Sequence, residues 1–430
     1  LLFYTNGIYI ENRIHDSLLN TQDFNPGFVT DLYNSEGSGI PQAVIVLPYP
    51  GKKNEYIVFH VSGEYFLAYG QYQVQPLHLN YSVIDINLDG GLGGIIEGKK
   101  NLPAISDTVS QGRLIACKHA NGRDWWVVTH KFHSDKYYKV LVSPDTVQQF
   151  EQSIGNVFTT NDIFGMAVFS PDGSHYAQLN NNDTIDLLQF DRCTGEFSNQ
   201  ITLAVPDTPV KLSATLSCSF SPSSRYLYVS SYRRIWQFDT WSSDINGSIM
   251  LVDSIDYYSY LYDPLFLHQL APDGKIYIST FDTDGLDPNL HVINNPDSIA
   301  ALADFVPYGF SLPPIGGNFS VPNFPNYDLG PLQGSGCDTL YLTNNDLQLP
   351  VDITIAPNPV ADWLNIIYKL HDDAEFELRD LYGKKVASIS LFHYFKNRMI
   401  DVSALPAGVY LASVIQKGKR VWGEKVIVMN

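Results

Sequence analysis

Several features that would point directly to a function are missing from this sequence. Its 430 residues hold only 27 Lys and Arg against 45 Asp and Glu, a formal net charge of -18 at pH 7. Because a protein with this negative net charge would repel phosphate backbones, nucleic-acid binding is disfavoured. No apolar run approaches the ~18 residues that a membrane-spanning helix needs, and no amphipathic helical pattern is sustained.

Cysteine is also scarce. The four cysteines, Cys117, Cys193, Cys218 and Cys337, show no C-x-x-C spacing, so we expect no zinc site. In an oxidising compartment they could form disulfides, and four cysteines allow three pairings. We expect Cys193 with Cys218 first, because these two flank one connection between strands.

The familiar catalytic motifs are absent as well. The sequence contains no G-x-S-x-G nucleophile elbow and no H-E-x-x-H metalloprotease motif. Nothing in it therefore requires an enzyme.

What the sequence does contain is typical of an all-β protein. It has 27 Tyr, 23 Phe, 31 Gly and 25 Pro, which favours aromatic strands joined by many turns. The length exceeds that of one ordinary hydrophobic core, so we expect several domains or a repeat.

A repeat of about fifty residues is visible. The stretches FSPDGSHYA from Phe169, FSPSSRYLYV from Phe220 and LAPDGKIYIS from Leu270 share an apolar residue, a Pro turn and an aromatic strand. Units from Cys117 and Leu47 have the same form, and LLFYTNGIYI fits the second strand of a still earlier, incomplete unit. Four strands in about fifty residues predict the blade of a β-propeller.

Residues 1–330 resemble WD-repeat-like β-propellers of largely uncharacterised secreted proteins. In those relatives a further segment precedes LLFYTNG, so we expect N-terminal strands to be missing here. The resemblance implies seven blades in the intact protein, with six as the alternative. The stretches that carry it are LLFYTNG (1–7), HANGRDWW (119–126), FDRCTGEFS (190–198), FSPSSRYLYVS (220–230) and VPNFPNYDLGPLQGSGCDTL (321–340).

Residues 351–430 form a second β-rich unit, which residues 331–350 link to the propeller. Short apolar strands alternate with turns, as in a small β-sandwich. This unit carries 10 basic and 9 acidic residues, so the negative excess lies in residues 1–350. It resembles the C-terminal sorting domain of the type IX secretion system, in its type A form. The matching residues include Pro357, Asn358, Pro359, Asp380, Gly383, Lys384, Gly408 and Tyr410.

The resemblance implies export. Such domains carry cargo across the outer membrane and are often removed at the surface, sometimes in exchange for a lipid-sugar anchor. The implied partners are the type IX translocon and the outer-membrane attachment machinery, and the implied location is outside the cell or on its surface. An ordinary immunoglobulin-like module without a sorting role is the alternative. No signal peptide stands at Leu1, so we expect one upstream of this sequence.

The densest polar cluster is HANGRDWWVVTHKFH. Its His119, His130 and His133 could bind a metal or catalyse proton transfer. The structural alternative is a hairpin turn at Asn121 that is held by Arg123 and Asp124.

A second candidate is a loop with Asp282, Asp284 and Asp287. Clustered carboxylates suit Ca²⁺, and no Lys or Arg occurs between Lys275 and Lys369. The loop lacks the EF-hand pattern, and Asp-Gly and Asp-Pro are ordinary turn pairs. We therefore expect no cofactor, with Ca²⁺ as the alternative.

Two functional hypotheses follow. The first is a non-enzymatic propeller that binds a surface glycan or protein ligand, or assembles as a homo-oligomer at the surface. Exposed tyrosines at 256–262 would serve such binding, or would pack between blades. The second is a secreted hydrolase or lyase that acts on polysaccharide or peptide in the propeller channel. Acidic or histidine side chains from several blades at one channel mouth would favour the enzyme, and an apolar channel would favour binding.

Overall fold

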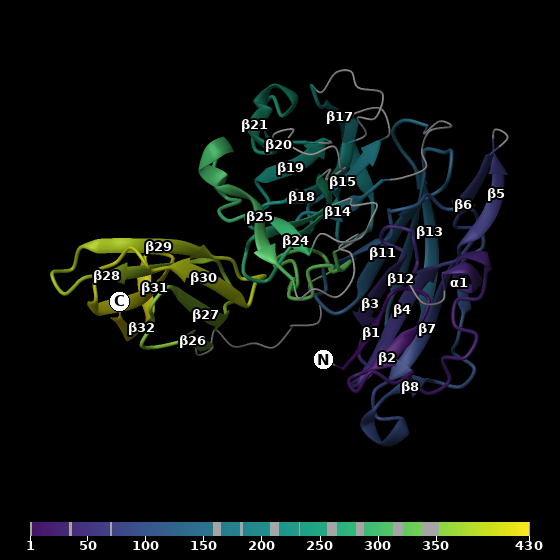
Figure 1. Ribbon diagram of the computed structural model, residues 1–430, viewed down its shortest axis with the longest axis horizontal. Coiled ribbons are helices and arrows are strands. Elements are labelled where there is room, and N and C mark those ends of the chain that lie inside the picture. The colour runs from purple at the N-terminus through teal and green to yellow at the C-terminus, as the bar shows by residue number, and fades with distance from the viewer. Residues whose placement is uncertain are drawn as a thin grey trace.

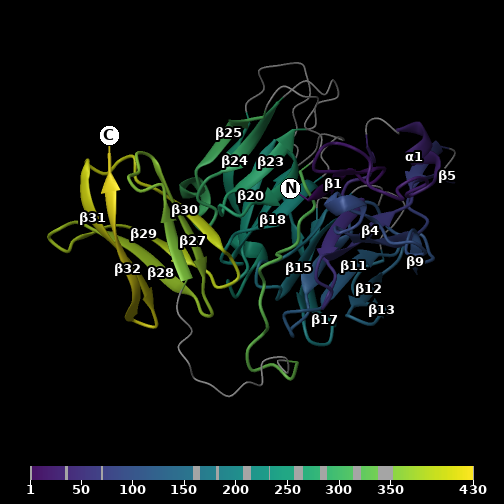
Figure 2. The same ribbon diagram turned by 90° about the horizontal axis from the view of Figure 1, so that it is seen from below.

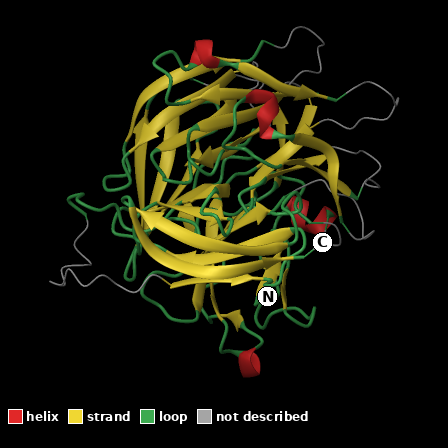
Figure 3. Ribbon diagram, turned by 90° about the vertical axis from the view of Figure 1, so that its left-hand side faces the viewer, coloured by secondary structure: helices red, strands yellow, loops and turns green. Residues whose placement is uncertain are grey.

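The structure is a computed structural model of the chain. It describes residues 2–33, 37–68, 71–157, 165–180, 184–206, 215–231, 233–255, 265–280, 288–312, 321–337 and 352–429. Nearly all of its regular structure is β, as the composition predicts (Figure 3). Among the described residues, no helix has the length and apolarity to cross a membrane.

Four antiparallel sheets of four strands follow one another along the chain, and each pairs its strands in sequence order (Figure 1). They are the blades predicted from the repeats at Cys117, Phe169, Phe220 and Leu270, and they confirm the β-propeller. Their strands are β10 (Ile115–Lys118), β11 (Trp125–His130), β12 (Lys136–Val142) and β13 (Val147–Ser153); β14 (Ala167–Phe169), β15 (His175–Asn180), β16 (Thr184–Phe190) and β17 (Phe197–Ala204); β18 (Thr215–Phe220), β19 (Tyr226–Ser231), β20 (Arg234–Asp239) and β21 (Met250–Ser254); β22 (Leu265–Leu270), β23 (Ile276–Thr280), β24 (Asn289–Ile293) and β25 (Phe305–Ser311).

The unit that begins at Leu47 forms a fifth sheet, β3-β4-β7-β8, in which β9 also pairs with β7. The hairpin β5-β6 and the short helix α1 lie beside it (Figure 1). The bounds are β3 (Val44–Pro48), β4 (Glu55–Val61), β5 (Glu64–Ala68), β6 (Gln71–Gln75), β7 (Leu79–Asp85), β8 (Gly94–Ile95), β9 (Leu102–Ile105) and α1 (Phe28–Leu32), and the 3-10 turn η1 (Asp89–Gly91) lies between β7 and β8. Two further 3-10 turns belong to later sheets: η2 (Asn246–Ser248) lies between β20 and β21, and η3 (Ala300–Ala303) between β24 and β25.

The first ten residues differ from the prediction of a single strand. They form two short strands, β1 (Phe3–Thr5) and β2 (Ile10–Asn12), around a turn. The Asn6 side chain accepts hydrogen bonds from the amides of Ile8 and Tyr9, and Gly7 has a positive φ of 88°, so the chain reverses there. Five sheets and this hairpin account for the six predicted units, and a seventh blade stays a prediction.

Each blade packs on the next through large side chains. Strand β11, with the sequence WWVVTH, is buried at all six positions between its neighbours. One core joins the β3, β10 and β14 sheets, a second joins the β14 and β18 sheets, and a third joins the β18 and β22 sheets. A strand buried on both faces needs this apolar and aromatic composition.

Residues 352–429 form a separate sandwich of two sheets, β26-β27-β30 and β29-β28-β31-β32. Its core consists of its own side chains, such as Leu364, Phe376 and Val414. The sandwich lies beside the last propeller sheets and turns β27 and β30 toward them (Figures 1 and 2). Its strands are β26 (Asp352–Ala356), β27 (Trp363–Lys369), β28 (Ala374–Arg379), β29 (Lys385–Leu391), β30 (Asn397–Asp401), β31 (Gly408–Gln416) and β32 (Lys419–Val428).

Candidate functional site

The turns of the repeat gather on one face of the propeller. In the first of them, Ser170 Oγ and Ser174 Oγ donate hydrogen bonds to the Asp172 carboxylate, and Gly173 takes a positive φ of 74°. The turns at Pro171 and Pro222 each accept a hydrogen bond from a segment that is distant in the sequence, as the next paragraphs describe. We call this surface the turn face.

Residues 321–337, here called the strap, run from the starts of β3 and β10 to the turn face. Asn323 Nδ2 donates to the carbonyl oxygens of Val44 and Leu114 at 3.1 and 2.8 Å, and Asn326 Nδ2 donates to that of Pro171 at 2.8 Å. The Tyr327 hydroxyl donates to Val46 O at 2.8 Å. Side-chain amides and a phenol thus tie the strap to three successive sheets. The predicted linker begins at residue 331, and its described part, up to Cys337, belongs to this bound segment.

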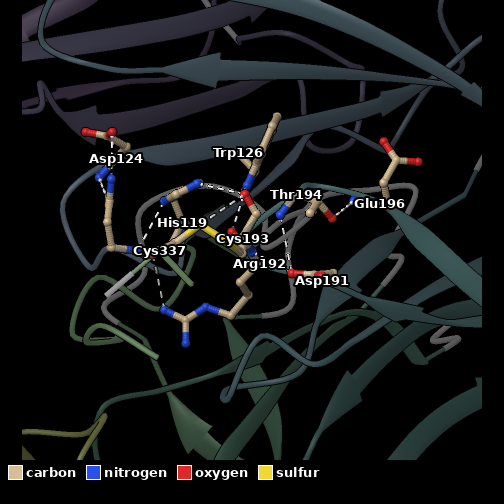
Figure 4. Close-up of a disulfide and its surroundings, with 10 residues drawn as sticks. His119, Asp124, Trp126, Asp191, Arg192, Cys193, Thr194, Glu196 and Cys337 are labelled. Atoms are coloured by element: carbon tan, nitrogen blue, oxygen red, sulfur yellow. Dashed lines mark hydrogen bonds between the residues drawn. A yellow bond between two sulfur atoms is a disulfide. The ribbon is translucent and has the colours of Figure 1, made fainter. Parts of the chain in front are cut away.

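A disulfide fixes the end of the strap, and it corrects the predicted pairing. Cys193 bonds to Cys337 (Figure 4). Cys218 is a buried free thiol on β18, as Cys117 is on β10. The prediction of Cys193 with Cys218 was wrong because the Cys218 side chain lies in the core between sheets. Cys193 sits in the turn after β16, where the strap passes.

An axial cavity of about 180 Å³ lies beneath the strap. First strands of four sheets form its wall, through residues such as Ile115, Phe169, Phe220 and His268. Strap residues 323–328 close one side, and residues 395–397 of the C-terminal domain complete the wall. Most of the lining residues are apolar or carry amides. Such a lining suits a small uncharged ligand better than a charged one.

His268 is the one histidine among the described residues that line this cavity. Its Nδ1 lies 3.3 Å from Ser219 Oγ, and its Nε2 is buried without a hydrogen-bond partner in the described structure. Burial lowers the pKa of His268 to about 3, so the ring is neutral at pH 7. A neutral imidazole nitrogen can exchange one hydrogen bond with a ligand.

The cavity wall holds little acid–base chemistry. Asp328 is the one carboxylate among its described residues, and it forms an ion pair with Lys396. The Gln42 side chain is engaged in two bonds with the backbone of Ala167, at 2.9 and 3.0 Å. Asp328, Lys396 and Gln42 thus already form ion pairs or hydrogen bonds within the protein.

The polar cluster at residues 119–133 is divided among separate places. Asn121 Oδ1 accepts the amides of Arg123 and Asp124 at 3.0 Å, and Arg123 pairs with Asp124 at 2.6 Å. His119 Nε2 lies 2.9 Å from Cys193 O, beside the disulfide (Figure 4). These contacts form the hairpin turn that was the structural alternative.

The two other histidines of that cluster do not join His119. His130 is fully buried on β11, and burial, together with the charge of Arg113, lowers its pKa well below the ordinary value. His133 lies after the end of β11, with its ring stacked on Phe132. Within the described part of the chain, no three His, Cys, Asp or Glu side chains gather to hold a metal ion.

The other candidates lie where nothing is described. Asp282, Asp284 and Asp287 fall within residues 281–287, and the tyrosine run at 256–262 falls within 256–264, both outside the described residues. Both stay predictions.

The predicted sorting-domain residues occupy turns of the C-terminal sandwich. Asn358, between Pro357 and Pro359, donates to Lys425 O at 2.7 Å and accepts the amide of Ile427 at 3.0 Å. The first turn is thereby tied to the last strand, β32. The peptide bonds that precede both prolines are cis.

The second motif is a self-contained turn between β28 and β29. Asp380 Oδ1 accepts the amides of Tyr382 and Lys384 at 2.9 Å, and Gly383 has a positive φ of 83°. Leu381 and Tyr382 lie within the predicted motif, and their side chains are 69% and 98% exposed at the turn, which the sequence did not predict. The sequence feature that could have indicated this exposure is the pair Leu381 and Tyr382 within an otherwise polar turn.

The third motif lies where β31 begins. Gly408 opens the strand, and the buried Tyr410 donates its hydroxyl hydrogen to Pro406 O at 2.7 Å.

Comparison with known families identifies this domain. Residues 354–429 match the family model described as the secretion system C-terminal sorting domain. The class of protein is therefore an all-β propeller with a C-terminal sorting domain. The chain is a cargo of the type IX secretion system, whose machinery it engages, and it is exported to the medium or the cell surface.

Comparison with other proteins adds no activity. No curated protein matches the chain. Solved structures that match include a functionally unknown protein from Desulfotomaculum acetoxidans DSM 771, at 11% identity and TM-score 0.39, over 93% of this chain and 94% of that one. A luciferin-regenerating enzyme matches at 13% identity and TM-score 0.31, over 55% and 69%. The Myceliophteria thermophila Cps50 (Swd1) beta-propeller domain matches at 10% identity and TM-score 0.31, over 54% and 74%.

Proposed function

We propose that this exported protein is a non-enzymatic binding protein that holds a small, uncharged ligand in the axial cavity of its propeller. The observation that carries the proposal is the composition of the cavity wall. Aromatic and aliphatic side chains such as Phe169, Phe220 and Met166 dominate it. Such a lining favours binding by burial of apolar surface.

The wall gives little support to the enzymatic alternative. General acid–base catalysis of hydrolysis needs carboxylates or histidines placed on both sides of a substrate. Here the described wall offers His268 from one sheet and Asp328, which Lys396 already neutralises. Assembly at the surface, the other half of the first hypothesis, stays a prediction.

The size of the cavity and its polar atoms suggest the class of ligand. A volume near 180 Å³ is close to that of an apolar cavity that accommodates one benzene ring. The unpartnered Nε2 of His268 would be satisfied by one hydroxyl or carbonyl group. A single-ring molecule with one hydrogen-bonding group meets both conditions.

Binding of 4-fluorophenol and of fluorobenzene to the full chain tests the proposal by ¹⁹F NMR. We expect saturable binding of 4-fluorophenol with a Kd of about 1 mM or tighter. Ala167→Leu should fill the cavity and weaken binding at least about tenfold. Ala177→Leu is the matched control, because Ala177 is equally buried in the same sheet but does not line the cavity.

A third variant, His268→Leu, tests the polar contact. It should lower the preference for 4-fluorophenol over fluorobenzene about two- to tenfold, because one hydrogen bond is lost. Absence of saturable binding in the wild-type chain, or equal weakening by Ala167→Leu and Ala177→Leu, would contradict the proposal.

A further inference from the structure

The sorting domain is anchored in the propeller by residues 392–398, here called the docking loop. Tyr394 is buried among core residues of the propeller, and its hydroxyl donates to Pro222 O at 2.9 Å in the turn of another blade. Phe395 packs against both the propeller core and the core of the sorting domain. The two domains thus share a hydrophobic contact.

Charged side chains surround this anchor. Lys396 pairs with Asp328 of the strap, and Arg398 lies 3.8 Å from Asp297. The Arg398 side chain is 8% exposed and is seated against the turn at Gly274. On the other side of the contact, Lys275 Nζ lies 4.2 Å from the ring centroid of Trp363 on β27. The basic groups of the docking loop thus face acidic groups of the strap and of the last propeller sheet.

The same loop reaches the axial cavity. Phe395, Lys396 and Asn397 belong to its lining, next to strap residues and the first strands of the blades. Asn397 Oδ1 is buried and has no hydrogen-bond partner in the described structure. Two buried polar atoms of cavity-lining residues, the acceptor Asn397 Oδ1 and His268 Nε2, therefore have no hydrogen-bond partner in the described structure.

We propose that the sorting domain forms one wall of the ligand site, so that ligand binding and docking of the domain stabilise each other. This inference rests on the proposed function, because it concerns the same cavity. The hydroxyl group of a bound ligand accepts the hydrogen of His268 Nε2 and donates its own hydrogen to Asn397 Oδ1, while the ring lies against Phe395. A propeller whose sorting domain has swung away offers neither contact.

Thermodynamic linkage makes the coupling reciprocal. A ligand that contacts residues of both domains binds the docked form more tightly than the undocked form, and it shifts the equilibrium toward docking by the same factor. The sorting domain then has a second role besides export. Its presence or absence sets the affinity of the propeller for its ligand.

Undocking without changing the cavity wall is the first test. Arg398→Glu places a carboxylate opposite Asp297, and neither residue lines the cavity. The double variant Asp297→Arg with Arg398→Glu restores opposite charges. Lys417→Glu is the matched control, because its partner Asp372 lies within the sorting domain itself. Small-angle X-ray scattering of the full chain reports docking, and ¹⁹F NMR reports the affinity for 4-fluorophenol.

We expect Arg398→Glu to enlarge the radius of gyration and to weaken 4-fluorophenol binding at least about tenfold. The double variant should recover most of both losses, and Lys417→Glu should change neither. Excess 4-fluorophenol should return part of the Arg398→Glu population to the docked state. An undocked variant that binds as tightly as the wild type would overturn the inference and leave the proposed function standing.

A direct change of the wall covers the case in which Arg398→Glu stays docked. Asn397→Ala should weaken binding of 4-fluorophenol about two- to tenfold and leave binding of fluorobenzene unchanged. Phe395→Ala should weaken binding of both. If Asn397→Ala and Phe395→Ala bind both probes like the wild type while scattering shows a docked domain, the sorting domain is no part of the site. If the wild-type chain binds neither probe, the proposed function fails, and the inference fails with it.

Discussion

At the scale of single residues, Gly173 occupies a tight turn and lies close to side-chain atoms of Arg192 and Cys117. Its φ of 74° lies in the left-handed region, where a side chain is strained. A Cβ atom there would lie 2.7 Å from both Arg192 Cδ and Cys117 Sγ. Arg192 in turn donates to Lys118 O at 2.9 Å and to Gly330 O of the strap. The missing side chain thus makes room for a residue that holds the strap.

We predict that Gly173→Ala lowers the free energy of unfolding by about 2–4 kcal/mol. The left-handed conformation accounts for about 1–2 kcal/mol, and the overlap with Arg192 and Cys117 for the rest. Gly98→Ala is the matched control, since Gly98 has the same φ of 74° but no atom within 4 Å of the added Cβ. Urea unfolding of both variants is the measurement, and equal losses would show that the overlap costs nothing.

His268 predicts a dependence of stability on pH. Its folded pKa of about 3 lies below the unfolded value of about 6.5, so the unfolded chain binds the proton in that interval and the folded chain does not. The stability is therefore complete above pH 6.5 and falls as the pH is lowered toward 3. His60, whose pKa burial also lowers to about 3, adds an equal contribution.

We therefore expect His268→Gln to reduce the slope of unfolding free energy against pH by about 1 kcal/mol per pH unit between pH 6 and 4. The loss of stability that the substitution itself causes does not affect this slope. His60→Gln should change the slope by a similar amount. Urea titrations at several pH values measure it, and a slope like that of the wild type in both variants would refute the prediction.

At the scale of elements, the strap depends on its disulfide. Cys193 and Cys337 are 144 residues apart, so their bond restricts a long loop of the unfolded chain. We predict that Cys337→Ser lowers the free energy of unfolding by about 3–5 kcal/mol. Hydrogen exchange at the Leu332 amide, which donates to Ala120 O, should rise as the end of the strap loosens.

Reducing agent provides the control for this prediction. It should destabilise the wild-type chain to about the level of Cys337→Ser and leave the variant itself unchanged. The buried thiols Cys117 and Cys218 exist in both proteins and do not contribute to the difference. A variant as stable as the oxidised wild type would show that the hydrogen bonds of the strap suffice.

The blades could be predicted from the sequence because each carries its own local signal. The turn prolines Pro171, Pro222 and Pro272 recur at nearly constant spacing, and aromatic strands follow them. The C-terminal domain could also be predicted from the sequence, because its turn motifs at Asn358 and Asp380 lie in the region that matches a known family. In both cases neighbouring residues determine the structure.

The strap and the cavity could not be predicted in this way. Asn323 and Asn326 bond to backbone carbonyl groups of distant strands, and any strand offers such groups. The disulfide partner of Cys193 depends on the path of the strap, which no periodicity records. His268, within the apolar stretch LFLHQL, has the sequence context of a packed core histidine. Only the arrangement of four sheets around one axis places it at a cavity.

At the scale of the whole molecule, two cores meet at the apolar side chains of Tyr394 and Phe395, and charged pairs surround this contact. Residues 1–350 hold 17 basic and 36 acidic residues, whereas the sorting domain is close to neutral. Its docking loop nevertheless presents Lys396 and Arg398 to Asp328 and Asp297. Electrostatic complementarity of this kind directs the orientation of docking more than its strength. We predict that export and docking use different parts of this one domain.

That separation yields a prediction for the cell. Deletion of residues 352–430 should leave the propeller in the periplasm and reduce the exported fraction at least about tenfold, because residues 354–429 form the sorting domain. Arg398→Glu, which disturbs docking but leaves the core of the sorting domain intact, should be exported like the wild type. Immunoblots of periplasm, surface and medium measure the distribution. Normal export of the deletion would refute the sorting role, whereas retention of Arg398→Glu would mean that the translocon needs the docked arrangement of the two domains.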